Sequence, residues 1–257
     1  MTAEINSTVS LKENIASKIV SAFADVPPRK DIMIFADNVF AEAKIRLEEM
    51  AKTAEAAYYG GIFDERLERL RTLGCPAFIL KKLQTKKGEV VSKACALNMP
   101  DNRDSLIPVI SSHYLTIYSQ LGMINFNGIT GDTDLEASRI INALKKCISQ
   151  NDSKIFDGVY FVLDIDDGAN TEKLTCAEAD ERIKGKNRYP LTVEEIIARL
   201  LQKTESPVCN LLAVGSRYEQ DDKVPVFTSA GNKTWLTTCF NSTIHPHSVT
   251  PSCGARV

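Results

Sequence analysis

The residues best suited to chemistry lie near the end of this 257-residue chain. His245 and His247 flank a proline, and two residues at that spacing in extended chain point to the same side. Cys239 and Cys253 lie six residues before and six residues after this pair. Four thiolate and imidazole ligands complete a tetrahedral metal site. The pattern raises the hypothesis of a site for zinc or another divalent cation. Because the spacing is not a common zinc-finger spacing, the alternative is a structural or surface histidine pair.

Cys253 is also a candidate catalytic nucleophile. A neighbouring His247 and the positive charge of Arg256 would stabilise its thiolate. Asp164 or Asp166 would then orient the imidazole. Chain ends are usually mobile and position catalytic groups poorly, so the alternative is a small buried or inert thiol.

Three aspartates, Asp164, Asp166 and Asp167, follow the apolar run Val159–Leu163. Carboxylates at the carboxyl end of a strand can bind a divalent cation. The pattern is similar to the first motif of haloacid-dehalogenase-type phosphatases, but Gly168 stands where that motif has Thr or Val, and too few residues follow to supply the later motifs. The alternative is a turn whose acids cap a helix.

Arg217 is a candidate anion-binding residue, because it follows a glycine that permits close approach and its guanidinium can form two hydrogen bonds to phosphate or carboxylate. The alternative is a salt-bridge partner at the end of a strand. The sequence contains no P-loop, Rossmann fingerprint or nucleophile elbow.

Helical spacing dominates the first third of the chain. A capping box at Ser10 predicts a helix that Pro27-Pro28 stops, and a longer helix is expected over residues 37–58, ending at Gly60-Gly61. Shorter helices are expected from Phe63 to Leu70 and from Pro76 to Leu83.

In the middle of the chain, apolar residues recur in some segments at helical spacing and in others at strand spacing. Leu106–Ile110 is expected to form a strand with Pro108 at an edge, because proline cannot donate to a ladder. The segment Tyr114–Phe126 fits helix and strand equally. A capping box predicts a further helix from Thr133 to Cys147.

The second half predicts a sheet. Val159–Leu163 has the composition of a buried central strand, and capping boxes at Thr175 and Thr192 predict two helices. Three short strands are expected at 209–214, 224–228 and 234–240. The fold class is therefore α+β, with a helical N-terminal region (1–61) packed on a mixed, largely antiparallel sheet from the α+β domain (62–257), or with both in one continuous domain.

Several short motifs recur in the order typical of one bacterial family. They are Val162–Gly168, Tyr189–Glu195, Val214–Arg217, Val224-Pro225, the Trp235 region, and the terminal Asn241, His247, Ser252 and Cys253. With the helix Phe63–Leu73, they resemble an uncharacterised, largely actinobacterial domain-of-unknown-function family over Phe63–Leu73 and Gly158–Val257. The resemblance implies no established activity and no catalytic role.

Composition narrows the function classes. With 44% hydrophobic and 25% charged residues the chain is typical of a globular protein, and its net charge of −2 gives no reason to expect a nucleic-acid partner. An acidic N-terminus and the lack of a long apolar run predict neither signal peptide nor membrane span. Seven scattered cysteines favour a reducing, cytoplasmic compartment.

We expect a non-catalytic interaction or scaffolding protein of the bacterial cytoplasm, with a protein partner or a second copy of itself. The alternative is a small-molecule or hydrolytic enzyme that uses the Asp164–Asp167 loop and the Cys/His tail, with or without a metal.

Overall fold

The structure, a computed structural model, describes residues 30–97, 99–100, 104–133, 144–146, 158–218, 222–230 and 233–257. The helix predicted between Ser10 and Pro27 lies outside these residues. The chain divides into two compact units, Met1–Thr53 and Ala54–Val257. The division falls before the predicted boundary at residue 61, inside a helix.

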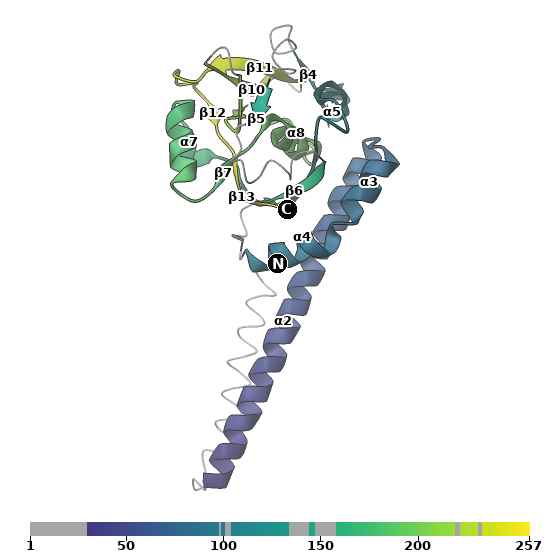
Figure 1. Ribbon diagram of the computed structural model, residues 1–257, viewed down its shortest axis with the longest axis vertical. Helices are drawn as coiled ribbons and strands as arrows, with labels where there is room; N and C mark the ends of the chain where they lie inside the picture. The colour runs from purple at the N-terminus through teal and green to yellow at the C-terminus, as the bar shows by residue number, and fades with distance from the viewer. Residues whose placement is uncertain are drawn as a thin grey trace. The chain divides into compact units, whose positions relative to one another are not determined.

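That helix, α2, runs unbroken over Lys30–Thr72 (Figure 1). The prediction of two helices separated at Gly60-Gly61 was therefore wrong. A glycine in a helix interior costs about 1 kcal/mol relative to alanine. Packing offsets this cost, because Phe63, Leu67 and Leu70 are buried in the core just after the two glycines, and full burial of such side chains contributes about 1.5–3 kcal/mol each.

One sheet has four strands in the order β1-β6-β13-β7 and is antiparallel throughout. The run Val159–Leu163 forms most of a buried inner strand, as predicted. Pro108 lies on an edge strand, also as predicted, opposite Phe161. The four strands are β1 (Asp104–Ile110), β6 (Val159–Asp166), β13 (Ser252–Arg256) and β7 (Tyr189–Pro190).

A second sheet has the order β12-β8-β10-β11-β4. β10 is antiparallel to both β11 and β8, whereas β4 and β12 join the sheet as short parallel strands. The three strands predicted in this region are confirmed. The five strands are β4 (Asp132–Thr133), β8 (Asn210–Leu212), β10 (Lys223–Ala230), β11 (Lys233–Phe240) and β12 (Ser248–Val249).

Two small ladders complete the described strands. β2 (Asn125–Phe126) pairs with β3 (Ile129–Thr130), and β5 (Leu144–Lys146) pairs with β9 (Ser216–Tyr218). The helix predicted from Thr133 to Cys147 was wrong at residues 144–146, because a partner strand seventy residues later in the chain takes up that backbone. Residues 134–143 lie outside the description.

The remaining helices follow their local signals. Thr175 and Thr192 begin their helices with the predicted capping boxes, and the ambiguous segment 114–126 contains both a helix and a strand. The elements are α3 (Ala77–Gln84), α4 (Lys87–Ala96), α5 (Ile117–Met123), the 3-10 turn η1 (Ala169–Thr171), α7 (Cys176–Lys184) and α8 (Val193–Leu201).

One hydrophobic core joins these elements. It contains Phe63 of α2, Phe161 of β6, Ile197 of α8 and Phe227 of β10, so both sheets and α8 share it. The α+β class and the largely antiparallel sheets are thus confirmed. None of the described helices combines the length and apolar character that crossing a membrane requires.

Candidate functional site

The C-terminal segment is an inner strand of the four-stranded sheet. Cys253 in β13 lies between Ile165 of β6 and Tyr189 of β7, and Val257 exchanges two backbone hydrogen bonds with Phe161, at 2.8 and 2.9 Å. The C-terminal segment is therefore ordered within the sheet, with Ser252 and Cys253 paired on both sides. The acidic loop and the tail do meet in space, as paired strands.

Arg188 joins these strands through one guanidinium. It donates hydrogen bonds to the Asp164 carboxylate and to the backbone carbonyl of the same residue. It also donates to the Ser252 hydroxyl at 3.0 Å and to the Ser252 carbonyl at 3.2 Å. Both members of the ion pair are mostly buried. The Asp164 carboxylate is thus neutralised by Arg188.

The backbone of Asp164 is unusual for a strand. Its φ is 55°, in the left-handed region that aspartate tolerates better than most residues. Gly254 lies beside it, and a β-carbon at that position would overlap the Asp164 carboxylate. A glycine at 254 therefore gives this carboxylate the space in which it meets Arg188.

The thiol of Cys253 has no exposed surface. Burial raises its pKa to about 12, while Arg256 acts to lower it and Glu195 to raise it. Arg256 thus acts on the Cys253 pKa in the predicted direction, but the effect of burial is larger. No hydrogen bond joins Cys253 to the exposed His247 in the described part of the chain. Such a thiol is protonated at neutral pH and is a poor nucleophile.

Arg256 forms a buried, bidentate ion pair with Glu195. Its Nε donates to Glu195 Oε1 at 2.6 Å and its Nη2 donates to Oε2 at 3.0 Å. Tyr160 donates to the same carboxylate at 3.2 Å, and the backbone of Thr192 at 2.8 Å. This network holds the end of β13 against the start of α8.

The four residues predicted to bind a metal form no cluster in the described part of the chain. Cys239 accepts or donates a hydrogen bond with the buried Cys176, and burial adds to this contact in raising the pKa of Cys239. His245 contacts the backbone carbonyl of Phe240 at 3.2 Å. Across the described residues, no three or more His, Cys, Asp and Glu side chains form a group that could hold a metal ion.

The acidic loop is built as two turns. Asp166 accepts a hydrogen bond from the backbone of Gly168 at 2.9 Å, and Asp167 accepts one from Ala169 at 3.1 Å. Gly168 has a φ of 87°, and a β-carbon there would overlap the backbone of Thr250. Only glycine therefore fits where the loop meets the chain before β13.

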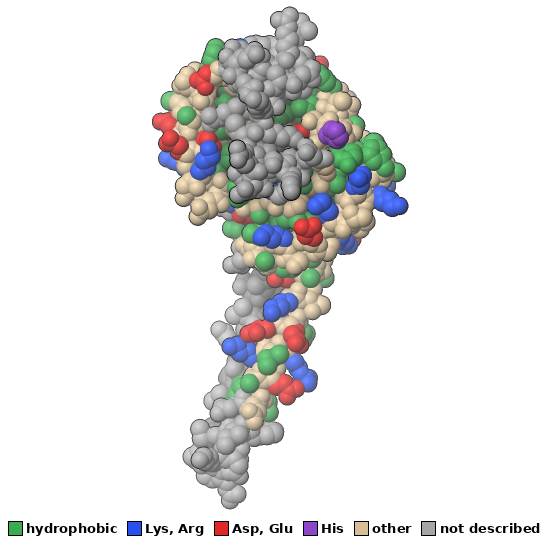
Figure 2. Space-filling model, in the orientation of Figure 1, with side chains coloured by type: hydrophobic (Ala, Val, Ile, Leu, Met, Phe, Trp, Pro, Cys, Tyr) green, Lys and Arg blue, Asp and Glu red, His purple; other side chains and the backbone are tan. Residues whose placement is uncertain are grey.

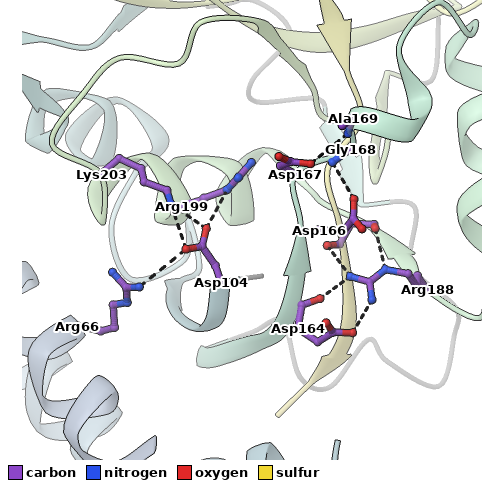
Figure 3. A network of polar contacts seen from close by, with 11 residues as sticks. Arg66, Asp104, Asp164, Asp166, Asp167, Gly168, Ala169, Arg188, Arg199 and Lys203 are labelled. Atoms are coloured by element: carbon purple, nitrogen blue, oxygen red, sulfur yellow. Dashed lines mark hydrogen bonds and ion pairs between the residues drawn. The ribbon is translucent and has the colours of Figure 1, made fainter. Parts of the chain in front are cut away.

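Asp104 at the start of β1 is surrounded by cations. Burial acts to raise its pKa, but the hydrogen bond and charge of Lys203, together with Arg199 and Arg66, lower it below the ordinary value. The carboxylate lies among these three cations (Figure 3). Its distances are 2.9 Å to Lys203, 3.4 Å to Arg199 and 3.9 Å to Arg66. One carboxylate thus faces three positive charges.

A half-open pocket of about 360 Å³ lies beside this cluster. The acidic loop forms one wall, the end of α8 another, and the loop that follows α8 the rim. The lining residues are Asp167, Ala169, Arg199, Leu200, Lys203, Glu205, Ser206, Pro207, Val208, Cys209, Leu211 and Val249. Of the predicted binding residues Asp167 reaches the pocket, whereas the side chain of Arg217 lies outside the description.

Sequence reasoning missed Arg188, Glu195 and Asp104. Nothing in the local sequence distinguishes them, because each acts on a partner at least 24 positions away in the chain. The capping box at Thr192 was the only local sign of Glu195, and it predicts one of its hydrogen bonds.

Together these features define an α+β protein whose two main sheets share one core, with an inner C-terminal strand and a charged pocket beside α8. The chain belongs to a family of unknown function, DUF5701, whose model matches residues 74–232. The predicted membership of an uncharacterised family is confirmed. The match includes residues 86–151, which the motifs did not reach, and stops before the C-terminal strand. No curated protein and no solved structure matches the chain.

Proposed function

We propose that this chain is a non-catalytic interaction protein. One observation carries the proposal: the side chains best suited to chemistry hold the sheet together. Asp164 is paired with Arg188, and the Cys253 thiol is buried between paired strands. These contacts weigh against the alternative of an enzyme in which Cys253 is the nucleophile and Asp164 orients the histidine. The scattered cysteines support a reducing compartment, and we propose a cytoplasmic location on that ground.

The interaction surface that we propose is a stripe along the first half of α2. Phe40, Ala43, Leu47, Met50 and Ala54 recur at alternating steps of three and four residues, which is the spacing of a coiled-coil seam. Phe40 and Met50 are 39% and 68% exposed, and apolar side chains lie among charged ones along this part of the helix (Figure 2). Helices of this kind gain most of their stability from packing an apolar face.

The partner that fits this stripe is a second copy of α2. In an antiparallel pair with Leu47 opposite Met50, Phe40 lies opposite Ala57 and Ala43 opposite Ala54. Phe40 then packs on a small residue and Leu47 packs on Met50, so each helix presents the same apolar stripe to the other.

Sedimentation or light scattering of the full chain tests the proposal. We expect a dimer, with about twice the 28.4 kDa of one chain. Leu47→Asp should give a monomer with unchanged helical content. Ile45→Asp is the matched control, because Ile45 is 56% exposed but lies off the seam, and it should remain dimeric.

A monomeric parent protein would overturn the proposed self-association. So would equal dissociation of the two variants, since it would mean that the seam has no special role. Protection of Phe40 in a monomer would indicate that another segment of the chain covers the stripe.

A further inference from the structure

The pocket beside α8 has the dimensions of a small-molecule site. Its volume of about 360 Å³ lies within the range of about 300–1,000 Å³ that such sites occupy. It is independent of the α2 stripe, because every lining residue comes from positions 167–249.

One wall of the pocket is positively charged. Arg199 lies in the last turn of α8 and Lys203 lies just after the helix, and both side chains contact the same carboxylate, Asp104. Both already contact Asp104, but that single carboxylate is shared with Arg66 as well. Lys203 is 42% exposed, so its ammonium can donate to a further oxygen.

The facing wall is negatively charged. Asp167 is exposed and uses one carboxylate oxygen to accept from the backbone of Ala169. Cys209 lies between the two walls. Burial raises the pKa of its thiol, and Arg199 acts on that thiol in one direction and Asp167 in the other. Groups of opposite charge thus lie near the same thiol.

The base of the pocket is apolar, and its rim holds one buried polar group. Leu200, Leu211 and Val249 are buried beneath it. The hydroxyl of Ser206 is buried at the rim and has no hydrogen-bond partner in the described part of the chain. A buried hydroxyl left without a partner costs about 1–3 kcal/mol, which a ligand acceptor or donor would recover.

We propose that this pocket binds a small zwitterion with an apolar side chain, such as a free α-amino acid. The ligand carboxylate lies against Arg199 and Lys203, its ammonium group against Asp167, and its side chain on Leu200, Leu211 and Val249. A ligand that carries only one charge is attracted by one wall and repelled by the other. A ligand that carries both charges is attracted by both walls.

Calorimetry with the full chain and L-leucine or L-phenylalanine as probe tests this. We expect at least one of them to bind with a Kd of about 1 mM or tighter, and the N-acetyl derivative and the methyl ester to bind at least about tenfold more weakly. Asp167→Asn should weaken binding of the free amino acid by about tenfold while leaving the N-acetyl derivative, which lacks the ammonium group, unaffected. Glu181→Gln, an exposed acid on α7, is the matched control and should not change binding.

Two results would overturn the proposal. The first is the absence of binding by either amino acid in a protein shown to be folded by circular dichroism. The second is equal binding of the free and N-acetylated probes, which would identify an anion site only. Because self-association of α2 is measured by mass, failure of either proposal leaves the other standing.

Discussion

Arg188 holds both the carboxylate and the backbone carbonyl of Asp164, and by the same guanidinium it holds Ser252. An aspartate that looks catalytic in the sequence is thereby part of a clamp between β6, β13 and the start of β7. The consequences can be measured, because an ion pair of this kind is costly to break when one partner stays buried.

Asp164→Asn removes the charge but keeps a residue that tolerates the left-handed backbone. It leaves the buried Arg188 without its counter-ion, so the free energy of unfolding should fall by about 3 kcal/mol. Urea unfolding measures this. Asp167→Asn, on the exposed turn nearby, should change it by less than about 0.5 kcal/mol. Equal effects of the two substitutions would rule out the clamp.

Arg256→Met tests the second network. It leaves Glu195, which has no exposed surface, as an unpaired charge. The free energy of unfolding should therefore fall by about 3–5 kcal/mol. Adding Glu195→Gln should restore part of the loss, because the two residues act as one unit. An exposed arginine, Arg182, provides the control. Strict additivity of the two substitutions would contradict the bidentate pair.

Acid should weaken the Asp104 cluster. The folded-state pKa of Asp104 lies below the ordinary value of 3.8, so the carboxylate contributes stability above that pH and loses it as the pH falls through the folded-state pKa. Asp104→Asn should therefore cost about 1–3 kcal/mol at neutral pH and progressively less below pH 3.8. Asp64→Asn, an exposed ion-pair partner on α2, is the control. A cost that does not change with pH would contradict the proposed role.

Thiol labelling separates a structural cysteine from a nucleophile. Burial raises the pKa of Cys253 to about 12, so the thiol should be protonated and inaccessible at pH values where reagents attack exposed cysteines. The half-buried Cys95 and Cys209 should react before Cys253, which should react only after unfolding, as followed by mass spectrometry of peptides. Preferential native labelling of Cys253 would restore the enzyme hypothesis.

The sequence predicted the elements whose signals are local. The apolar run 159–163, both capping boxes and the edge position of Pro108 are confirmed, since each depends on neighbouring residues. Predictions failed where contacts between distant parts of the chain determine the secondary structure. Residues 144–146 pair with 216–218 instead of continuing a helix, and packing carries α2 through Gly60-Gly61.

The candidate site shows the same division. The hypothesis that Asp164 or Asp166 acts with Cys253 required these residues to be close, and their strands do pair. Their contacts, however, depend on Arg188 and Glu195, which have no sequence motif of their own. Spacing along the chain suggested a metal site at His245 and His247. The structure instead uses the residues around them to turn the chain from β11 into β12.

The central claim is that the C-terminal segment is a structural strand. Native-state hydrogen exchange of the peptide covering 252–257 tests it most directly, with the β6 peptide 159–166 as the internal reference. If β13 pairs with β6 and β7, the two peptides should exchange together and slowly, at the rate of the most protected amides of the domain. Exchange of the C-terminal peptide at the rate of an unstructured chain, while β6 remains protected, would contradict the account.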